Sequence, residues 1–245
     1  MEQLVGWLVE SLSQTDLRLS CQVQQIEKTD SVWKIQTRSG VGSKESATIE
    51  ADGIVVATSA GIAGKLLDSV DGELAQQLGT IQAASSAIVV IGVDRDQINR
   101  QFEGYGIIVP SVLNRNVIAT SFSSNKFAGR APAGKLLIRT FIGGALQPEL
   151  VELDDEALVK IAADELDATV GFSGRLELSR VYRWRDCMPQ YHLGHVERVE
   201  SIQQIIGRHR GLQVAGNSYR GVGIPACIQS GSEAIERLVD QISDL

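Results

Sequence analysis

Three glycines near the C-terminus lie between an expected strand and an expected helix. The stretch Gly216-Asn217-Ser218-Tyr219-Arg220-Gly221-Val222-Gly223 follows the short apolar segment 212–215, and it precedes a predicted helix over 224–242 with Pro225 in the first turn. Glycine allows positive φ and close approach to the backbone, and a helix start presents unpaired N–H groups at its positive end. This pattern predicts a site for the electron-rich edge of a ligand, such as a phosphate or a carbonyl. An ordinary strand-to-helix connection is the alternative.

A second stretch, upstream, gathers side chains that could titrate, bind metal or attack a substrate: Trp184-Arg185-Asp186-Cys187-Met188-Pro189-Gln190-Tyr191-His192-Leu193-Gly194-His195. His192 and His195 are three residues apart, but no third ligand stands at metal-site spacing. Neither histidine has a paired nucleophile nearby in sequence. We interpret 189–195 as a structural turn, with His195 as a catalytic base the minority alternative. No catalytic residue and no metal ligand is assigned.

Composition limits the classes of protein that this chain can be. It has 245 residues, 43% of them hydrophobic and 22% charged, which is typical of a globular protein with one large or two modest domains. The net charge of −7 argues against a nucleic-acid partner. No uncharged apolar run is long enough for a membrane span. The cysteines are three and widely separated, which predicts a reducing, cytoplasmic compartment.

The hydrophobic pattern predicts an α/β chain interrupted by a strand-rich middle. Before residue 80 we expect an amphipathic helix over 2–13 with Leu4, Leu8 and Leu12 on one face, and an alternating strand from Leu17 to Lys28. The other expected elements of this part are strands over 32–37 and 47–51, a buried parallel strand over 54–58, and helices near 60–67 and 72–79. Later elements are strands over 87–93, 107–109, 117–121, 135–142 and 176–184, and helices over 153–169 and 196–208.

Both motif stretches resemble signatures of one family, the oxygen-dependent protoporphyrinogen and coproporphyrinogen oxidases of the FAD-dependent amine oxidase superfamily. Residues 184–195 are similar to the pattern W-x-x-x-x-P-x-Y-x-x-G-H, and residues 216–231 to the C-terminal flavin-contacting segment. The order and spacing also match. The resemblance implies the C-terminal part of a FAD/NAD(P)-binding Rossmann-like domain, formed by residues 1–79 and 186–245. Residues 80–185 would be an inserted mixed-sheet, substrate-binding domain.

The glycine fingerprint G-x-G-x-x-G, which opens such flavoproteins and cradles the pyrophosphate, does not occur in this sequence. We therefore expect the chain to correspond to the C-terminal half of an oxidase, as a truncated reading frame, a split subunit or an isolated domain. An N-terminal-half polypeptide is the partner that this implies. Without it, the chain is expected to hold FAD weakly or not at all.

The resemblance implies an oxidoreductase that acts on CH–CH groups. In the family, FAD accepts hydride from a porphyrinogen and passes the electrons to O₂, a step of haem biosynthesis. The sequence does not separate protoporphyrinogen from coproporphyrinogen, and peripheral contact with the inner face of the membrane is left open. Two alternatives remain: an amine oxidase or desaturase relative, and a non-catalytic remnant that binds a partner or porphyrin.

Carried over residue by residue, the resemblance places the backbone of Val222, Gly223 and Ile224 against the flavin and makes Asn217 a FAD contact. It also makes Val23 the residue that pairs the adenine, and it puts Ala57 and Thr58 in the FAD cleft. For the substrate, Phe141 of the Phe141-Ile142-Gly143-Gly144 segment would pack on a porphyrinogen ring, with Ile108 and Ser121 beside it. The family often has a larger apolar residue where Ser121 stands. The alternatives are purely structural: residues 222–224 would only begin a helix, and Phe141 would be an aromatic residue of the core.

Overall fold

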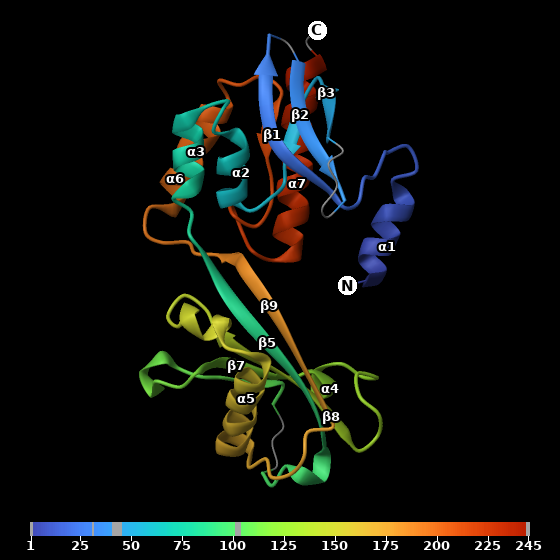
Figure 1. Ribbon diagram of the computed structural model, residues 1–245, viewed down its shortest axis with the longest axis vertical. Helices are drawn as coiled ribbons and strands as arrows, with labels where there is room; N and C mark the ends of the chain where they lie inside the picture. Colours follow the sequence, from blue (N-terminus) through green and yellow to red (C-terminus); the bar gives the residue numbers. More distant parts are fainter. Residues whose placement is uncertain (1, 31, 41–45, 101–103, 244–245) are drawn as a thin grey trace.

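Two long strands, β5 (Ala83–Asp94) and β9 (Leu178–Pro189), pair antiparallel and run from one lobe of the molecule into the other (Figure 1). This computed structural model describes residues 2–30, 32–40, 46–100 and 104–243. Each lobe has its own buried apolar cluster, and the two clusters share no residue. The chain enters the second lobe along β5 and returns along β9.

The first lobe is built on a parallel pair of short strands, β4 (Ile54–Val56) and β10 (Leu212–Val214). A three-stranded antiparallel sheet lies beside it, formed by β1 (Cys21–Thr29), β2 (Val32–Ser39) and β3 (Ser46–Ala51). Four helices complete the lobe: α2 (Ala60–Leu67), α3 (Gly72–Gly79), α6 (His195–Ile206) and α7 (Ile224–Ser243). The predicted parallel strand and both predicted helices after it are confirmed.

Apolar side chains from segments far apart in sequence form the core of this lobe. Trp33, Leu67, Leu74 and Ile202 are fully buried there. The start of α3 is fixed by Asp71, whose carboxylate accepts a hydrogen bond from the backbone N–H of Leu74 at 2.9 Å. This is the expected use of aspartate before a helix, because the first N–H groups lack acceptors within the helix.

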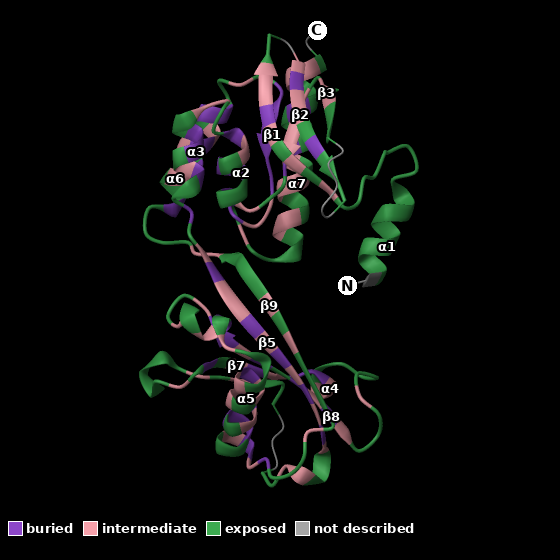
Figure 2. Cartoon of the chain, viewed as in Figure 1, coloured by how far each residue is buried: buried purple, intermediate pink, exposed green. Residues whose placement is uncertain are grey.

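The second lobe holds a five-stranded sheet in the order β6-β7-β8-β5-β9, where β6 is Gly106–Ile108, β7 is Val117–Phe122 and β8 is Lys135–Gly143. One face packs on α5 (Asp155–Val170), whose N-cap is Asp154. Short helical turns lie between the strands: η1 (Arg95–Gln97), η2 (Ser111–Leu113), α4 (Ser123–Lys126) and η3 (Pro148–Glu152). Alternate residues of β5 are buried against α5, while those between them face the open side (Figure 2).

Three expectations need correction. All the described pairs of this sheet are antiparallel, so a mixed sheet was wrong; the connection between β6 and β7 is too short for a parallel crossover. The strand expected from Leu17 begins at Cys21, and the side chains of Leu17 and Leu19 are exposed. α1 (Glu2–Ser11) is a helix as predicted, but Leu4, Leu8 and Leu12 are exposed and none joins a core (Figure 2).

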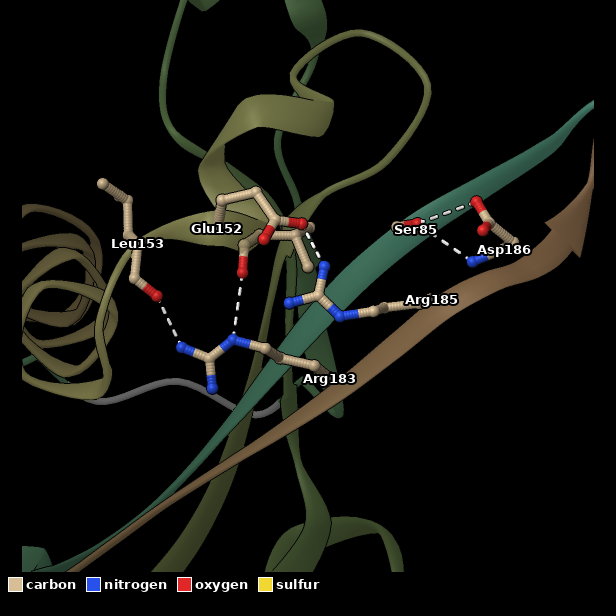
Figure 3. Close-up of polar contacts among 7 residues, drawn as sticks. Ser85, Glu152, Leu153, Arg183, Arg185 and Asp186 are labelled. Carbon is tan, nitrogen blue, oxygen red and sulfur yellow. Dashed lines mark hydrogen bonds and ion pairs between the residues drawn. The ribbon is translucent and has the colours of Figure 1, made fainter.

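A polar network fixes the waist where β5 and β9 leave the first lobe (Figure 3). Opposite Ser85 the ladder carries a bulge, and Asp186 adopts a left-handed φ of 49°. Ser85 Oγ accepts from the Asp186 N–H at 2.9 Å and lies 3.3 Å from its carboxylate. Further along β9, Arg183 donates to the carbonyls of Val151 and Leu153, and Arg185 pairs with Glu152. These contacts hold η3 on β9.

None of the helices in the described ranges combines the length and the apolar composition that a bilayer span requires.

Candidate functional site

The carboxyl ends of β4 and β10 meet at one edge of the first lobe, because the two strands are parallel. Ala215 N–H donates to the carbonyl of Val56 at 3.2 Å. The first N–H of α2, on Ala60, donates to Ser218 Oγ at 3.1 Å. Residues 57–59 and 216–218 therefore lie side by side, at the edge where open α/β sheets bind ligands.

Tyr191 joins the two motif stretches. Its hydroxyl donates to the carbonyl of Asn217 at 2.6 Å and accepts from the backbone N–H of Gly221 at 2.8 Å. The Asn217 amide in turn donates to the carbonyl of Cys187 at 3.3 Å. The segment 187–191 thus fixes both ends of the loop after β10.

His195 also contacts this loop, from inside the lobe. Its ring is buried and stacks on Tyr191, with centroids 3.8 Å apart and planes 12° from parallel. Nε2 lies 2.9 Å from the carbonyl of Tyr219, and since a carbonyl only accepts, Nε2 carries the proton. Residues 189–195 act as a structural turn, as the sequence predicted. The described residues contain no cluster of His, Cys, Asp and Glu that could hold a metal ion.

The loop ends at the exposed start of α7, which points towards the second lobe (Figure 1). Val222, Gly223 and Ile224 are exposed there. Within the described part of the chain, no group accepts a hydrogen bond from their three backbone N–H groups. These donors lie at the positive end of a 20-residue helix, so they suit the electron-rich edge of a ligand.

The glycines of the loop differ in what they do. Gly221 has a φ of 137°, and a Cβ on it would lie 2.7 Å from Ala226 Cβ, so the fold itself requires a glycine. Gly223 has no positive φ, and the nearest atom to an added Cβ is Pro225 Cδ at 3.8 Å. The chain therefore leaves open space at Gly223 that a flat ligand could approach closely.

The residues predicted to bind substrate come together on the open face of the second sheet. In the strand register, Ile108 is opposite Ala119, and Ala119 is opposite Phe141. Ser121 lies one row along, opposite Arg139. The structure thus places Ile108, Ser121 and Phe141 on the face that α5 does not cover.

Sequence reasoning missed two aromatic residues of that face. Tyr182 and Trp184 on β9 are each 53% exposed, and their partners in the register are Ile88 and Ser86. Period-two alternation in β9 was the signal that could have found them. Between them, Arg183 donates to the Val151 carbonyl of η3, and its guanidinium lies 2.6 Å from the Asp155 carboxylate.

The comparison with known families decides what this site belongs to. A profile described as flavin-containing amine oxidoreductase matches residues 1–239. The chain belongs to this flavin amine oxidoreductase family.

Several curated members of the family are named for porphyrinogens. A coproporphyrinogen III oxidase from Bacillus subtilis is 26% identical over 96% of this chain and 48% of its own length. The protoporphyrinogen oxidase of Homo sapiens is 29% identical over 82% of this chain and 42% of its own length. This flavin amine oxidoreductase chain therefore spans about half the length of the curated relatives it matches.

Solved structures agree on the fold. A structure from Exiguobacterium sp., provisionally named a protoporphyrinogen oxidase, superposes with a TM-score of 0.83 at 25% identity, over 97% of this chain and 50% of that one. A putrescine oxidase variant superposes with a TM-score of 0.68 at 12% identity, which shows a common fold alone.

The residues predicted to contact FAD do not all lie together in this family member. Ala57, Thr58, Asn217 and 222–224 share the edge described above. Val23 lies in β1, half-buried against the core and next to a register shift in its pairing with β2. No described hydrogen bond or ring contact joins Val23 to the loop 216–224, so its adenine role stays a prediction.

Proposed function

We propose that this chain forms the C-terminal part of a FAD-dependent porphyrinogen oxidase of haem biosynthesis, with O₂ as the electron acceptor. The main observation in support is the open start of α7, which has three backbone donors and an unobstructed glycine. Tyr191 fixes the loop that leads into it. The relatives named as coproporphyrinogen III and protoporphyrinogen oxidases support the substrate class. Bound FAD would supply the acceptor for a hydride from the porphyrinogen.

In this reaction, the residues of this chain would bind and orient the cofactor and the substrate. The N–H groups of Val222, Gly223 and Ile224 would lie against the flavin, where they stabilise negative charge as it develops on the ring. Ala57, Thr58 and Asn217 would contact the same cofactor from the strand ends. We assign the FAD to residues 1–79 and 186–245, with Val23 at the adenine.

The open sheet face of residues 80–185 would carry the substrate. On that face Phe141 is half-buried and Ile108 is 82% exposed, and Ser121 lies beside them. A flat apolar face suits a tetrapyrrole, because aromatic and aliphatic side chains pack well on its rings. Arg139, whose guanidinium lies 5.7 Å from the Phe141 ring centroid, would be available for a substrate carboxylate.

An N-terminal-half polypeptide completes the FAD site in this proposal, and the isolated chain holds FAD weakly. We place the protein in the cytoplasm, with peripheral contact at the inner face of the membrane and no nucleic-acid partner. The net charge of −7 supports the last point.

A fusion tests the proposal. The part of the B. subtilis oxidase outside the match is joined to this chain, and flavin absorbance and porphyrin fluorescence are measured with each porphyrinogen. We expect a yellow protein that forms fluorescent porphyrin, while the chain alone is colourless after gel filtration. A Soret-type band without flavin, in both proteins, would instead favour a porphyrin-binding remnant.

Gly223→Val in the same fusion tests the site itself. We expect bound FAD per folded protein to fall at least about tenfold, because the new side chain occupies the open space above the backbone. Gly72→Val is the matched control, since Gly72 is also at an open position, with no atom within 4 Å of an added Cβ, but lies in α3. Equal flavin content in both variants would remove 222–224 from the cofactor site.

A further inference from the structure

The open face of the five-stranded sheet is divided into rows that differ in chemistry. Residues directly opposite one another in an antiparallel sheet share a face, so the registers order the side chains of neighbouring strands into rows. One row runs across four strands and is apolar: Ala119 of β7, Phe141 of β8, Ile88 of β5 and Tyr182 of β9. We name these four residues the apolar row.

The next row, two residues further along each strand, is cationic. Arg139 of β8 and Arg180 of β9 are both opposite Val90 of β5, and both arginines are exposed. Neighbouring strands lie about 4.8 Å apart, so the α-carbons of the two arginines, on either side of β5, are about 10 Å apart. We name Arg139 and Arg180 the arginine pair.

No carboxylate in the described part of the chain forms an ion pair with either member of the arginine pair. The Arg139 guanidinium lies over the Phe141 ring instead, with its central carbon 5.7 Å from the ring centroid. Arg180 borders a hollow at the outer edge of β9 that Asp155 and Glu156 of α5 also line. The Asp155 carboxylate, however, pairs with another arginine of β9.

Other arginines of the same lobe are neutralised by the protein itself. Arg115 lies 2.9 Å from the Glu165 carboxylate, and Arg183 lies 2.6 Å from that of Asp155. A single unpaired arginine on a surface is ordinary. Two of them on one flat face, beside a row of apolar side chains, suit an amphipathic ligand with two carboxylates, because guanidinium groups bind carboxylates through paired hydrogen bonds.

The ribbon of β5 and β9 determines which row lies closer to the first lobe (Figure 1). β5 leaves that lobe at Ala83 and β9 returns to it at Pro189, so Ser86 and Trp184, which are opposite each other, lie nearest to it. The apolar row comes next, and the arginine pair follows. From Ser86 to Val90 the strand rises by about 13 Å. The open face is therefore apolar towards the start of α7 and cationic away from it.

We infer that the arginine pair binds the carboxylate edge of the substrate while the ring of the substrate lies on the apolar row. The inference rests on the proposed function for the class of substrate, a tetrapyrrole with propionates on neighbouring pyrroles. With two propionates at Arg139 and Arg180, the opposite edge of the ring points along the ribbon to the start of α7, where the flavin is proposed. The arginine pair thus sets the direction in which the substrate binds.

The same charges disfavour an amine as the substrate, although a putrescine oxidase shares the fold. A protonated amine is repelled by two unpaired guanidinium groups, whereas a carboxylate is attracted to them. The arginine pair therefore selects for anionic substrates on this face.

The first test measures binding to this chain alone, without flavin. Coproporphyrin and its tetramethyl ester, both fluorescent, are titrated in the same non-ionic detergent into the parent chain, Arg139→Gln and Arg180→Gln. We expect each substitution to raise Kd for the free acid about tenfold. Kd for the ester should not change, because its propionate groups carry no charge. Arg130→Gln is the matched control, since Arg130 is an exposed arginine in the loop after α4 of the same lobe.

The second test looks for the same pattern during turnover by the fused oxidase. KM for the porphyrinogen should rise about tenfold in Arg139→Gln and in Arg180→Gln, while kcat changes by less than about twofold. Added salt should raise KM of the parent but leave that of the double variant nearly constant, because salt screens the charges that the double variant lacks.

The remaining outcomes would overturn the inference or the function, and they differ. Equal Kd values for all three variants, equal losses for free acid and ester, or no binding of the free acid by the parent would remove the arginine pair from the substrate site. Arginine-dependent binding of the free acid, with a fusion that forms no porphyrin, would keep the arginine pair and reject the oxidase. A fusion that oxidises porphyrinogen with an unchanged KM in both variants would do the reverse.

Discussion

At the scale of single residues, Tyr191 is the side chain on which the geometry of the site depends most directly. One hydroxyl satisfies the carbonyl of Asn217 and the N–H of Gly221, at the two ends of the five-residue segment 217–221. Its ring also covers buried His195, which holds the carbonyl of Tyr219 between those ends. Tyr191 and His195 therefore hold three backbone groups of the loop, on Asn217, Tyr219 and Gly221.

Tyr191→Phe should loosen this loop without unfolding the lobe. Two hydrogen bonds near solvent are lost, so we expect the free energy of unfolding to fall by about 1–2 kcal/mol. Hydrogen exchange at the Gly221 amide should become faster. Tyr182→Phe is the control, since Tyr182 is similarly exposed and its hydroxyl has no partner among the described residues. Equal effects of the two changes would contradict the bridging role.

Phe141→Ala should weaken substrate binding in the fused oxidase. Loss of an aromatic contact is worth roughly 1–3 kcal/mol, which raises KM about ten- to a hundredfold. The flavin spectrum should not change, because Phe141 lies on the sheet face of the other lobe. Phe127→Ala, at an exposed phenylalanine of the same lobe, should leave KM unaltered. An unchanged KM in both variants would show that Phe141 has a structural role in the core rather than a role in substrate binding.

At the scale of elements, the start of α3 combines a helix cap with a hydrogen bond to the loop before β10. The Asp71 carboxylate caps the helix through Leu74 and lies 2.7 Å from His209 Nε2. The hydrogen bond from the Leu74 N–H, and then that from His209, lower the pKa of Asp71 below its usual value. The loop before β10 is thereby tied to the helix that packs on it.

Asp71→Ala should destabilise the protein by about 1 kcal/mol or more at neutral pH. Because the folded pKa of Asp71 is depressed, its contribution is complete above the unfolded value of about 3.9. It is lost as pH falls through the folded pKa, so the difference between variant and parent should shrink towards pH 3. Denaturant unfolding at several pH values measures this. Asp71→Asn should lose less at neutral pH, since asparagine also caps helices; an equal loss would assign the effect to the His209 contact.

At the scale of the whole molecule, two cores are joined by one antiparallel ribbon. The first is centred on α2, α3 and α6, and the second on α5 and the five-stranded sheet. The ribbon carries the bulge at Ser85 and Asp186 (Figure 3), which sets how the open sheet face stands relative to the start of α7. The start of α7 and the open face of the second sheet are thus both positioned by segments that lie outside them.

The two lobes should respond separately to core damage. Leu74→Ala and Leu166→Ala remove the same atoms from fully buried sites, one in each core. Each should cost about 2–5 kcal/mol. Hydrogen exchange should rise in α2, α3 and α6 for the first variant and in α5 for the second. Faster exchange throughout the molecule in both would show a single cooperative unit.

The sequence by itself determined most of the elements and both motif stretches. The helices at 60–67 and 72–79 and the strand that begins at Ile54 depend on local periodicity and on nearby backbone donors, which a single sequence contains. Leu17 and Leu19 show the limit of this, since alternation also occurs in an exposed segment that joins none of the described sheets.

Only the tertiary structure decided which distant residues meet. Tyr191 contacts Gly221 across 30 residues, and Ile108 shares a face with Phe141 through two strand registers. Register and loop closure depend on pairing partners far along the chain, so no local pattern specifies them. The burial of α7 is of the same kind: Ala234 and Leu238 are buried while Ile228 and Ile235 are exposed, and this depends on the elements against which the helix packs.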